Sequence, residues 1–573
     1  MKPDQGNRPA RGRGAGVGER TLQTCVLLVV LVLVAAPIAP VIMQSFSNTP
    51  LYDGMSALSL GGYWRALSSS AFRSAVVNTA IFATMATLIA QVVGVLATVL
   101  VARTNLPGAR GIMNLMLWPI YVSHLVLAFG WIVAYGPSGF VTLQVEQLIG
   151  WKPWNLYSLS GLSVAAGLSL APLTFLYSIG AARTIDPALE DAARLSGAGP
   201  FRTLAAITLP LLRPAIVTTT ILNFVLALEL FVMPLLLAVP SGMHFLTTFI
   251  YAEGFEASTP DHALVSAVAV MLIGVVTVLV LLQMHLVGDG KRFVTVGGKA
   301  GRARLLDLGR WRWPCCIALL AYLFATVLLV MGGLVVRSLA SVLSPFVPLA
   351  DVLTLDNYRT VFSFRAYVRS IWNTLGVAIV GALAGTVLVT ACAFVALRSD
   401  YRLRRPLEFI ALYPRAIPGL LVGMGVLWAT AWLPAMAWMQ NTIAILVFAF
   451  VMRHLPTGYG AIQPALLQIS GDHDRSARSV GASWLQTCLL VLAPQLRPAL
   501  FACYAILFIH FIKEYAVAVF LFGPGSEVMG TTMLSFWVQG ENGSVAALAV
   551  VQMAIIAVFM VIFRYVIGVR NYG

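Results

Sequence analysis

Long apolar runs alternate with short polar segments along almost the whole chain. Each run reaches the roughly 20 residues that an α-helix needs to cross the hydrocarbon core of a bilayer. The pattern therefore predicts about twelve membrane-spanning helices, six in each half of the chain. The predicted spans are residues 22–46, 74–102, 112–135, 158–182, 214–239, 263–287, 314–338, 370–397, 408–434, 442–462, 498–523 and 545–569.

Composition agrees with this pattern. Of the 573 residues, 59% are hydrophobic and only 10% are charged, which excludes a soluble domain with a single core. We therefore expect an all-α polytopic membrane protein. The first apolar run is longer than a signal-peptide core and lacks a small-residue cleavage site, so we expect it to be retained as the first helix.

The net charge of +15 raises the question of a nucleic-acid partner. Lysine and arginine, however, concentrate in alternate polar segments, namely 1–20, 103–110, 291–312 and 398–405, whereas the intervening segments hold few. This distribution follows the positive-inside rule for membrane proteins. It predicts that both termini are cytoplasmic, and it requires no nucleic acid.

One polar segment occurs twice. Residues 184–214 and 468–498 correspond at an offset of 284 residues (468 minus 184), which pairs Gly197 with Gly481 and Pro210 with Pro494. A fixed offset over a whole segment is typical of a duplicated unit. We therefore divide the chain into a first unit at 21–287 and a second at 314–573, fused head to tail around a pseudo-two-fold axis normal to the membrane.

Two polar stretches lie outside these units. Residues 1–20 are rich in glycine, arginine and proline and are predicted to be a disordered cytoplasmic tail. Residues 288–313 form a basic, glycine-rich stretch, which predicts a flexible cytoplasmic linker. Because Lys291 is followed by Arg292, this stretch lacks the phosphate-loop pattern, and we expect no ATP binding through that motif.

Each repeated segment carries the signals of a short helix. In the first copy, Asp186 suits the N-cap, Pro187 the first helical position and Gly197 a left-handed end. In the second copy, Ser470 takes the place of the cap and Gly481 that of the stop.

The first repeated segment resembles the cytoplasmic signature loop of the permease subunits of binding-protein-dependent ABC importers, whose general form is Glu-Ala-Ala, three residues, Gly, nine residues, Ile-x-Leu-Pro. The residues that carry this resemblance are Asp191, Ala192, Ala193, Gly197, Ile207, Leu209 and Pro210. The second copy keeps the 13-residue step from Gly481 to Pro494 but departs elsewhere. It has Arg475-Ser476-Ala477 in place of Glu-Ala-Ala, and Val491 in place of Ile.

In that family the loop is a coupling helix that sits in a groove of a separate ATPase subunit. The resemblance thus implies an ATPase dimer on the cytoplasmic face, a periplasmic solute-binding protein on the outer face, and a bacterial inner-membrane location. It also implies that this chain is a transport subunit rather than an enzyme, and that it carries no cofactor. The implied coupling residues are Glu190, Asp191, Ala192, Ala193, Gly197, Pro210, Asp474, Arg475, Ser476, Ala477, Gly481 and Pro494.

Other stretches resemble fused iron(III)-type permeases, whose single chain carries both permease units. They include the segment that begins at Glu229, the Lys513-Glu514 pair and residues 524–528. The resemblance implies import of ferric iron. Related permeases carry thiamine, polyamines, phosphonates or sugar phosphates, and these remain alternatives.

Five charged residues fall at membrane depth, where charges are costly and often functional. Glu229 and Lys513 are equivalent at the offset of 284, and Glu514 follows directly. Arg415 and Arg453 lie beside prolines that free backbone carbonyls. All five are candidates to line a translocation pathway. Alternatively, Lys513 pairs with Glu229 or Glu514, and the arginines extend to the membrane surface or bind the freed carbonyls.

The histidines and cysteines show no metal-ligand spacing, so we predict no metal site. Two other classes of function remain open. An ion-gradient-driven secondary transporter needs intramembrane carboxylates such as Glu229 and Glu514. A membrane-embedded enzyme needs clustered catalytic groups, of which the sequence shows none.

Overall fold

The computed structural model describes residues 17–53, 58–287 and 305–567. Throughout these residues the backbone forms helices joined by turns, with isolated β-bridges and no longer strand. The predicted all-α fold class is confirmed.

The helices of the first half are α1 Val17–Ser45, α2 Gly61–Ser68, α3 Ser70–Arg103, α4 Ala109–Leu117, α5 His124–Tyr135, α6 Phe140–Ile149, α7 Leu159–Thr184, α8 Pro187–Leu195, α9 Pro200–Thr203, α10 Leu209–Leu211, α11 Arg213–Glu229, α12 Val232–Leu237, α13 Leu246–Tyr251 and α14 His262–Val287.

Those of the second half are α15 Arg312–Leu323, α16 Leu329–Ser338, α17 Leu349–Val352, α18 Asp356–Ser363, α19 Arg365–Arg398, α20 Arg404–Leu412, α21 Gly419–Trp432, α22 Ile443–Gln468, α23 Asp472–Ser479, α24 Trp484–Gln486, α25 Ala493–Gln495, α26 Arg497–Lys513, α27 Met529–Val538 and α28 Asn542–Ile567.

The two halves repeat one another helix by helix. From α2 to the start of α5, each helix of the first half corresponds to a helix 295 residues later in the second. For example, α3 ends at Arg103 and α19 ends at Arg398. From α7 to α11 the offset is 284, as the ends of α11 and α26 at Glu229 and Lys513 show. The difference, 295 minus 284, is an insertion of 11 residues in the first half. It falls between α5 and α7 and contains α6.

The number of membrane spans agrees with the prediction. Among the described residues, nine helices are long and apolar enough to cross a membrane, and four further helix pairs qualify but are bent by 69° to 111°. One of these pairs, Val232–Ser241 with Leu246–Glu256, bends by 82° between α11 and α14. The predicted twelve lies within the resulting range of nine to thirteen spans.

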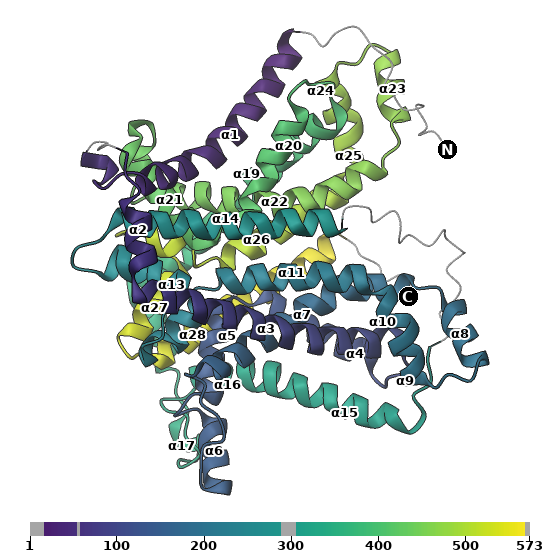
Figure 1. Ribbon diagram of the computed structural model, residues 1–573, viewed down its shortest axis with the longest axis vertical. Helices are drawn as coiled ribbons and strands as arrows, with labels where there is room; N and C mark the ends of the chain where they lie inside the picture. The colour runs from purple at the N-terminus through teal and green to yellow at the C-terminus, as the bar shows by residue number, and fades with distance from the viewer. Residues whose placement is uncertain (1–16, 54–57, 288–304, 568–573) are drawn as a thin grey trace.

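The first span of each half packs against the other half. Helix α1 contacts α20 and α21, while α16 contacts α5 and α15 contacts α4. Figure 1 shows α1 lying beside the green helices of the second half, and α15 beside α4 of the first. The two halves are therefore interlocked, which the sequence pattern did not indicate.

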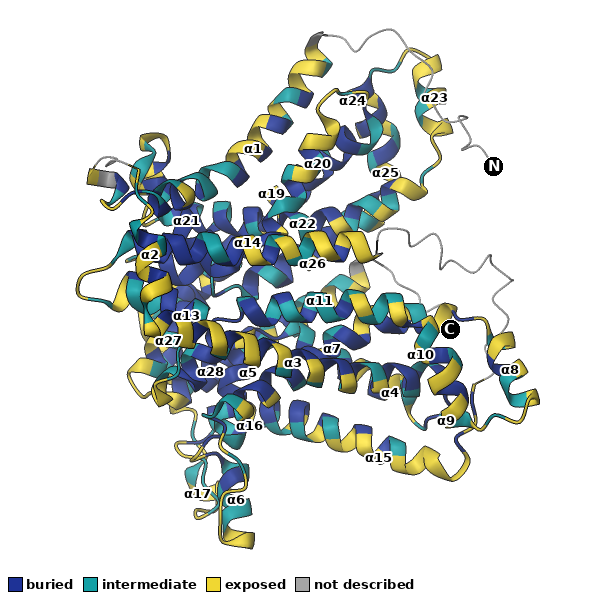
Figure 2. Cartoon of the chain, viewed as in Figure 1, coloured by how far each residue is buried: buried dark blue, intermediate teal, exposed yellow. Residues whose placement is uncertain are grey.

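Buried residues gather where the two halves meet (Figure 2). The outward sides of α1, α3 and α15 are exposed and apolar, for example at Val32, Leu88 and Ile317. Because lipid chains solvate apolar side chains, these faces suit contact with the bilayer.

Helices α8 and α23 lie at the same end of the molecule, well apart, in two arms that join towards the opposite end (Figure 1). Helices α13 and α27 lie at that opposite end. The two predicted loops are thus presented on one face.

The ends of the predicted tail and linker are ordered. Helix α1 begins at Val17, so residues 17–20 belong to the first span and not to a disordered tail. A helical turn covers Gly309–Trp311 and α15 begins at Arg312, so the last part of the predicted flexible linker is structured. The remainder of both segments, 1–16 and 288–304, lies outside the described residues.

Candidate functional site

The first repeated loop folds as the sequence predicts. Helix α8 is capped by Asp186, whose side chain accepts a hydrogen bond from the N–H of Ala188 at 2.9 Å, and Pro187 is its first residue. Gly197 adopts a φ of +84°, which favours glycine. The N–H of Ala198 then donates to the carbonyl of Ala193 at 3.0 Å, which closes the helix end.

The second loop has the same end but a different start. Gly481 adopts a φ of +91°, and the N–H of Ala482 donates to the carbonyl of Ala477 at 3.1 Å. The N-cap of α23 is Gly471 rather than the predicted Ser470. The Ser470 hydroxyl nevertheless accepts from the N–H of Asp472 at 3.2 Å, so it still satisfies one free amide of the first turn.

Each loop returns to the membrane through a bend after its proline. Pro210 precedes a 69° bend into α11, and Pro494 precedes a 79° bend into α26. The bend turns the chain from the loop into a span, α11 in the first half and α26 in the second.

A buried ion pair ties the first loop to the membrane helices. Arg103, the last residue of α3, donates from Nε to Oε1 of Glu190 at 3.0 Å and from Nη2 to Oε2 at 2.6 Å. Both side chains are at most 2% exposed. Arg103 also donates to the carbonyls of Ala182 and Ile185 at the end of α7. One guanidinium therefore joins α3, α7 and α8.

The second half repeats this arrangement with equivalent residues. Arg398 donates to Oδ2 of Asp474 at 2.9 Å and to the carbonyls of Leu466 and Ile469. We refer to the two arrangements as the arginine clamps. The clamps give the equivalent acids Glu190 and Asp474 a structural role, because each acid holds its loop against the end of a membrane helix.

The two clamps differ in completeness. Thr208 donates to Oε1 of Glu190 at 2.8 Å, whereas its equivalent in the second half is Leu492, which has no hydroxyl. Oδ1 of Asp474 is buried and has no hydrogen-bond partner among the described residues. The second clamp is thus the weaker one, because a buried acceptor without a partner costs free energy.

Four of the other predicted coupling residues lie at the surface of α8 and α23. Asp191 is half exposed and pairs with Arg194 at 3.5 Å, while Arg475 is exposed and pairs with Asp472 at 3.1 Å. Ala192 and its equivalent Ser476 are both exposed. The outer surfaces of α8 and α23 are free to meet another protein.

The predicted intramembrane charges form a layer between the halves. Arg453 on α22 donates to Oε2 of Glu229 at 2.5 Å and to the carbonyls of Ile417 and Pro414 at 2.5 and 3.4 Å. Glu229 belongs to the first half, so this ion pair crosses between the halves. The predicted binding of freed carbonyls is confirmed for Arg453. Arg415 is exposed.

Glu229 does not pair with Lys513, contrary to one of the alternatives from the sequence. Lys513 instead donates to the carbonyl of Ile120 at 2.7 Å, and Glu514 bonds to Nε2 of His454 at 3.0 Å. Ile120 lies in the break between α4 and α5, at the position equivalent to Arg415. Each half therefore reaches from the end of its fifth span towards the other half.

An aromatic pair lies directly beyond this layer. Phe231 and Tyr515 are equivalent at the offset of 284, and their rings stack at 6.4 Å with planes 9° apart. Two equivalent residues that touch one another must lie near the pseudo-two-fold axis. Both are nearly fully buried, and Tyr251, Phe255 and Phe520 extend the cluster. We call these rings the aromatic plug, and α13, which holds Tyr251, lies at the end of the molecule remote from α8 and α23 (Figure 1).

Comparison with known protein families identifies the family to which the chain belongs. The family described as binding-protein-dependent transport system inner membrane component matches residues 90–289 and 389–568, together more than half of the chain. The chain belongs to this family. Each match contains one loop and one arginine clamp's acid, so this permease carries two family units in one chain, and the apolar spans indicate a multi-pass inner-membrane protein.

Among its relatives are two permeases of ferric transport systems. The ferric transport system permease protein FbpB of Actinobacillus pleuropneumoniae is 27% identical over 78% of this chain and 65% of its own length. A putative ferric transport system permease protein of Haemophilus influenzae is 25% identical over 87% of this chain and 77% of its own length. The chain thus spans about two thirds to three quarters of these relatives.

A solved bacterial alginate ABC transporter, in complex with a pentasaccharide-bound periplasmic protein, matches 44% of this chain at 17% identity. The TM-score of this match is 0.36.

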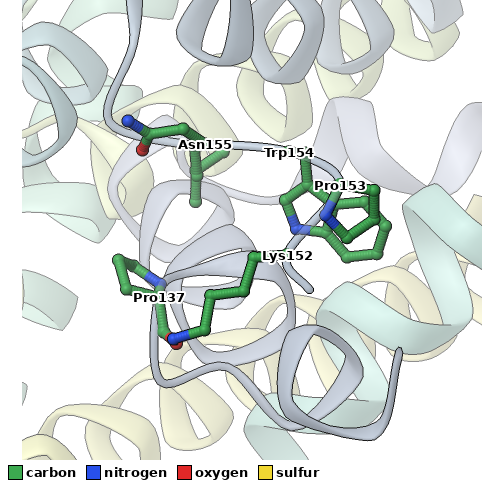
Figure 3. Close-up of a pocket in the computed structure, with 6 residues that line it drawn as sticks. Pro137, Lys152, Pro153, Trp154 and Asn155 are labelled. Atoms are coloured by element: carbon green, nitrogen blue, oxygen red, sulfur yellow. The ribbon is translucent and has the colours of Figure 1, made fainter. Parts of the chain in front are cut away.

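The permease also has a surface pocket, at the insertion that is particular to its first half. Pro137, Pro153, Trp154, Asn155 and Leu156 line it, together with Lys152. The Lys152 side chain reaches Pro137 and donates to its carbonyl at 3.0 Å (Figure 3). The Trp154 indole donates to Thr142 at 2.9 Å. These contacts brace the insertion at the far end of α7 from the loops, away from the charged layer.

Proposed function

We propose that this permease is the membrane-spanning subunit of an ATP-driven importer. The observation that carries this proposal is the pair of equivalent coupling helices on one face, each tied by an arginine clamp to two membrane spans. A clamp of this kind transmits a push on α8 or α23 to α3 and α7, or to α19 and α22, without a flexible joint.

A dimer of ATPase subunits is the expected partner on this face. Small or exposed residues on α8 and α23, such as Ala192 and Ser476, leave room for a partner's surface to approach closely. With α8 and α23 on the cytoplasmic side, both chain termini are cytoplasmic, as the distribution of lysine and arginine predicts. A solute-binding protein then docks at the opposite face, where the aromatic plug closes the pathway.

Ferric iron is the solute that we propose first, because two relatives are named as ferric transport permeases. The test is to purify the binding protein that associates with this permease and to identify its ligand by mass spectrometry and metal analysis. Bound iron supports the proposal. A metal-free organic ligand would replace iron with another small solute and would leave the importer itself intact.

The first coupling helix is expected to matter more than the second. Replacing Ala192 with Trp should lower ATP-dependent transport by about tenfold, equivalent to about 1.4 kcal/mol of coupling. The equivalent change, Ser476→Trp, should have a smaller effect because the second loop has lost the Glu-Ala-Ala pattern and its clamp is less complete. Transport by both variants is measured in the same reconstituted vesicles. Equal losses would show that the two loops couple equally.

A further inference from the structure

The end of the segment that joins the two halves is built into the first arginine clamp. The N–H of Leu306 donates to the carbonyl of Arg103 at 2.9 Å, and the N–H of Asn105 donates to the carbonyl of Leu306 at 3.1 Å. The backbone of Leu306 therefore runs parallel to the chain at Thr104, directly after the clamp arginine. We call residues 305–311 the strap.

Side chains strengthen this contact. The Asn105 amide donates to Oδ1 of Asp307 at 2.6 Å, and the same Asp307 oxygen accepts from the N–H of Gly309 at 2.9 Å. The side-chain oxygen of Asn105, Oδ1, accepts a hydrogen bond from the N–H of Leu308 at 3.1 Å. The hydrogen bonds from Gly309 and Asn105 lower the pKa of the Asp307 carboxyl below its ordinary value, so it is charged at neutral pH.

The strap also fills the base of the first coupling loop. Leu306 is fully buried. Its neighbours come from α3, the end of α7, the loop and the start of α11, and they are Val99, Ala182, Ile185, Leu204 and Leu212. Further along, the Trp311 ring packs edge-on against Phe201 of α9 at 5.9 Å.

In the second half, the backbone carbonyl of the clamp arginine receives its hydrogen bond from a different donor. There the carbonyl of Arg398 accepts a hydrogen bond from the Trp484 indole at 2.9 Å, and the Trp484 N–H donates to Glu19 of α1 at 2.8 Å. The residue equivalent to Trp484 in the first half is Pro200 (484 minus 284), which has no side-chain donor. In the first half, the backbone N–H of Leu306 therefore donates the hydrogen bond to the clamp arginine's carbonyl that the Trp484 indole donates in the second half.

We infer that the strap is a positioning element for the first coupling helix, and that fusion of the two units serves coupling as well as tethering. The inference rests on the proposed function. In this account the strap holds the carbonyl side of Arg103 while Glu190 holds its guanidinium, so α8 moves together with α3. An ordinary linker predicts no such effect, because any tether of sufficient length would serve.

The test compares the mobility of the two coupling helices in the full chain. Spin labels are placed at the equivalent exposed positions Leu195→Cys on α8 and Ser479→Cys on α23, with the native Cys25 and Cys315 replaced by serine. The double variant Asn105→Ala/Leu306→Ala should increase the mobility of the α8 label by about twofold and leave the α23 label unchanged, since local stability depends on local contacts. The comparator Trp484→Phe removes the indole donor of the second half, so it should increase the mobility of the α23 label and leave the α8 label unchanged.

A second arm separates the strap from the tether. A chain divided between residues 296 and 297, with both parts expressed together, retains the strap on α15 and should behave as the intact chain does. The inference is overturned if the double variant leaves the α8 label unchanged, or if division loosens α8 as much as the double variant does. Since the mobility measurement needs no ATPase, failure of the proposed function would appear separately, as an intact permease that binds no ATPase.

Discussion

Replacing Arg103 with methionine is expected to destabilise the permease more than any other single change in the loops. The substitution leaves Glu190 buried, 2% exposed, with only Thr208 as a hydrogen-bond partner. Removing one partner of a buried ion pair costs about 3–5 kcal/mol, because the remaining charge has lost both water and its partner. It also releases the carbonyls of Ala182 and Ile185. The measurement is the midpoint of thermal unfolding of the purified chain in detergent.

Two matched variants test the reason for this loss. Arg103→Met combined with Glu190→Met removes both charges and should recover most of the stability, since a buried pair can often be replaced by apolar residues of similar volume. Arg398→Met should cost less, about 1–3 kcal/mol, because Asp474 is 18% exposed and accepts fewer hydrogen bonds. If the double variant is as unstable as Arg103→Met alone, the pair itself is not the source of the effect.

Breaking the ion pair between Glu229 and Arg453 is expected to separate ATP hydrolysis from solute delivery. This ion pair crosses between the halves, and Glu229 lies two residues before Phe231 of the aromatic plug. Loss of a charged hydrogen bond worth about 2 kcal/mol shifts a two-state equilibrium by roughly 30-fold towards the state in which the halves part. The variant Arg453→Met should therefore hydrolyse ATP rapidly without the binding protein, when the ATPase subunits are present.

The control for this prediction is Arg65→Met. Arg65 pairs with Asp261 at 2.7 Å, but both residues belong to the first half and their side chains are 44% and 32% exposed. Exposed pairs of this kind contribute about 0–1 kcal/mol, so hydrolysis should stay dependent on the binding protein. Rapid hydrolysis by both variants would indicate general loosening, and unchanged hydrolysis by Arg453→Met would mean that the charged layer does not hold the plug closed.

The repeat in the sequence predicted much of this structure. An offset of 284 identified the two loops, their glycine ends and the equivalence of Glu229 with Lys513. The limit of this reasoning was the insertion that contains α6. Before it the offset changes to 295, so Arg103 and Arg398 were not recognised as equivalent residues and were counted only as positive-inside charges. Comparing the halves again with an insertion allowed would have paired them.

Other contacts could not be found from the sequence. Arg453 of α22 pairs with Glu229 of α11, and Lys513 of α26 binds the carbonyl of Ile120, so both contacts join segments from different halves of the chain. A backbone carbonyl also leaves no trace in the side-chain pattern. The strap could not be predicted either, because Leu306 binds Arg103 through its backbone N–H. It also lies in a stretch whose glycines and arginines are typical of a flexible linker.

The central claim is that ATP hydrolysis by a separate subunit drives import through this chain. The direct measurement is uptake of radiolabelled ferric iron by vesicles that contain the permease and its binding protein, with and without the ATPase subunits and ATP. We predict uptake only when both are present, and its loss in Ala192→Trp. Uptake that persists without ATPase, driven by an ion gradient, would contradict the account and assign the intramembrane carboxylates Glu229 and Glu514 to a secondary transporter.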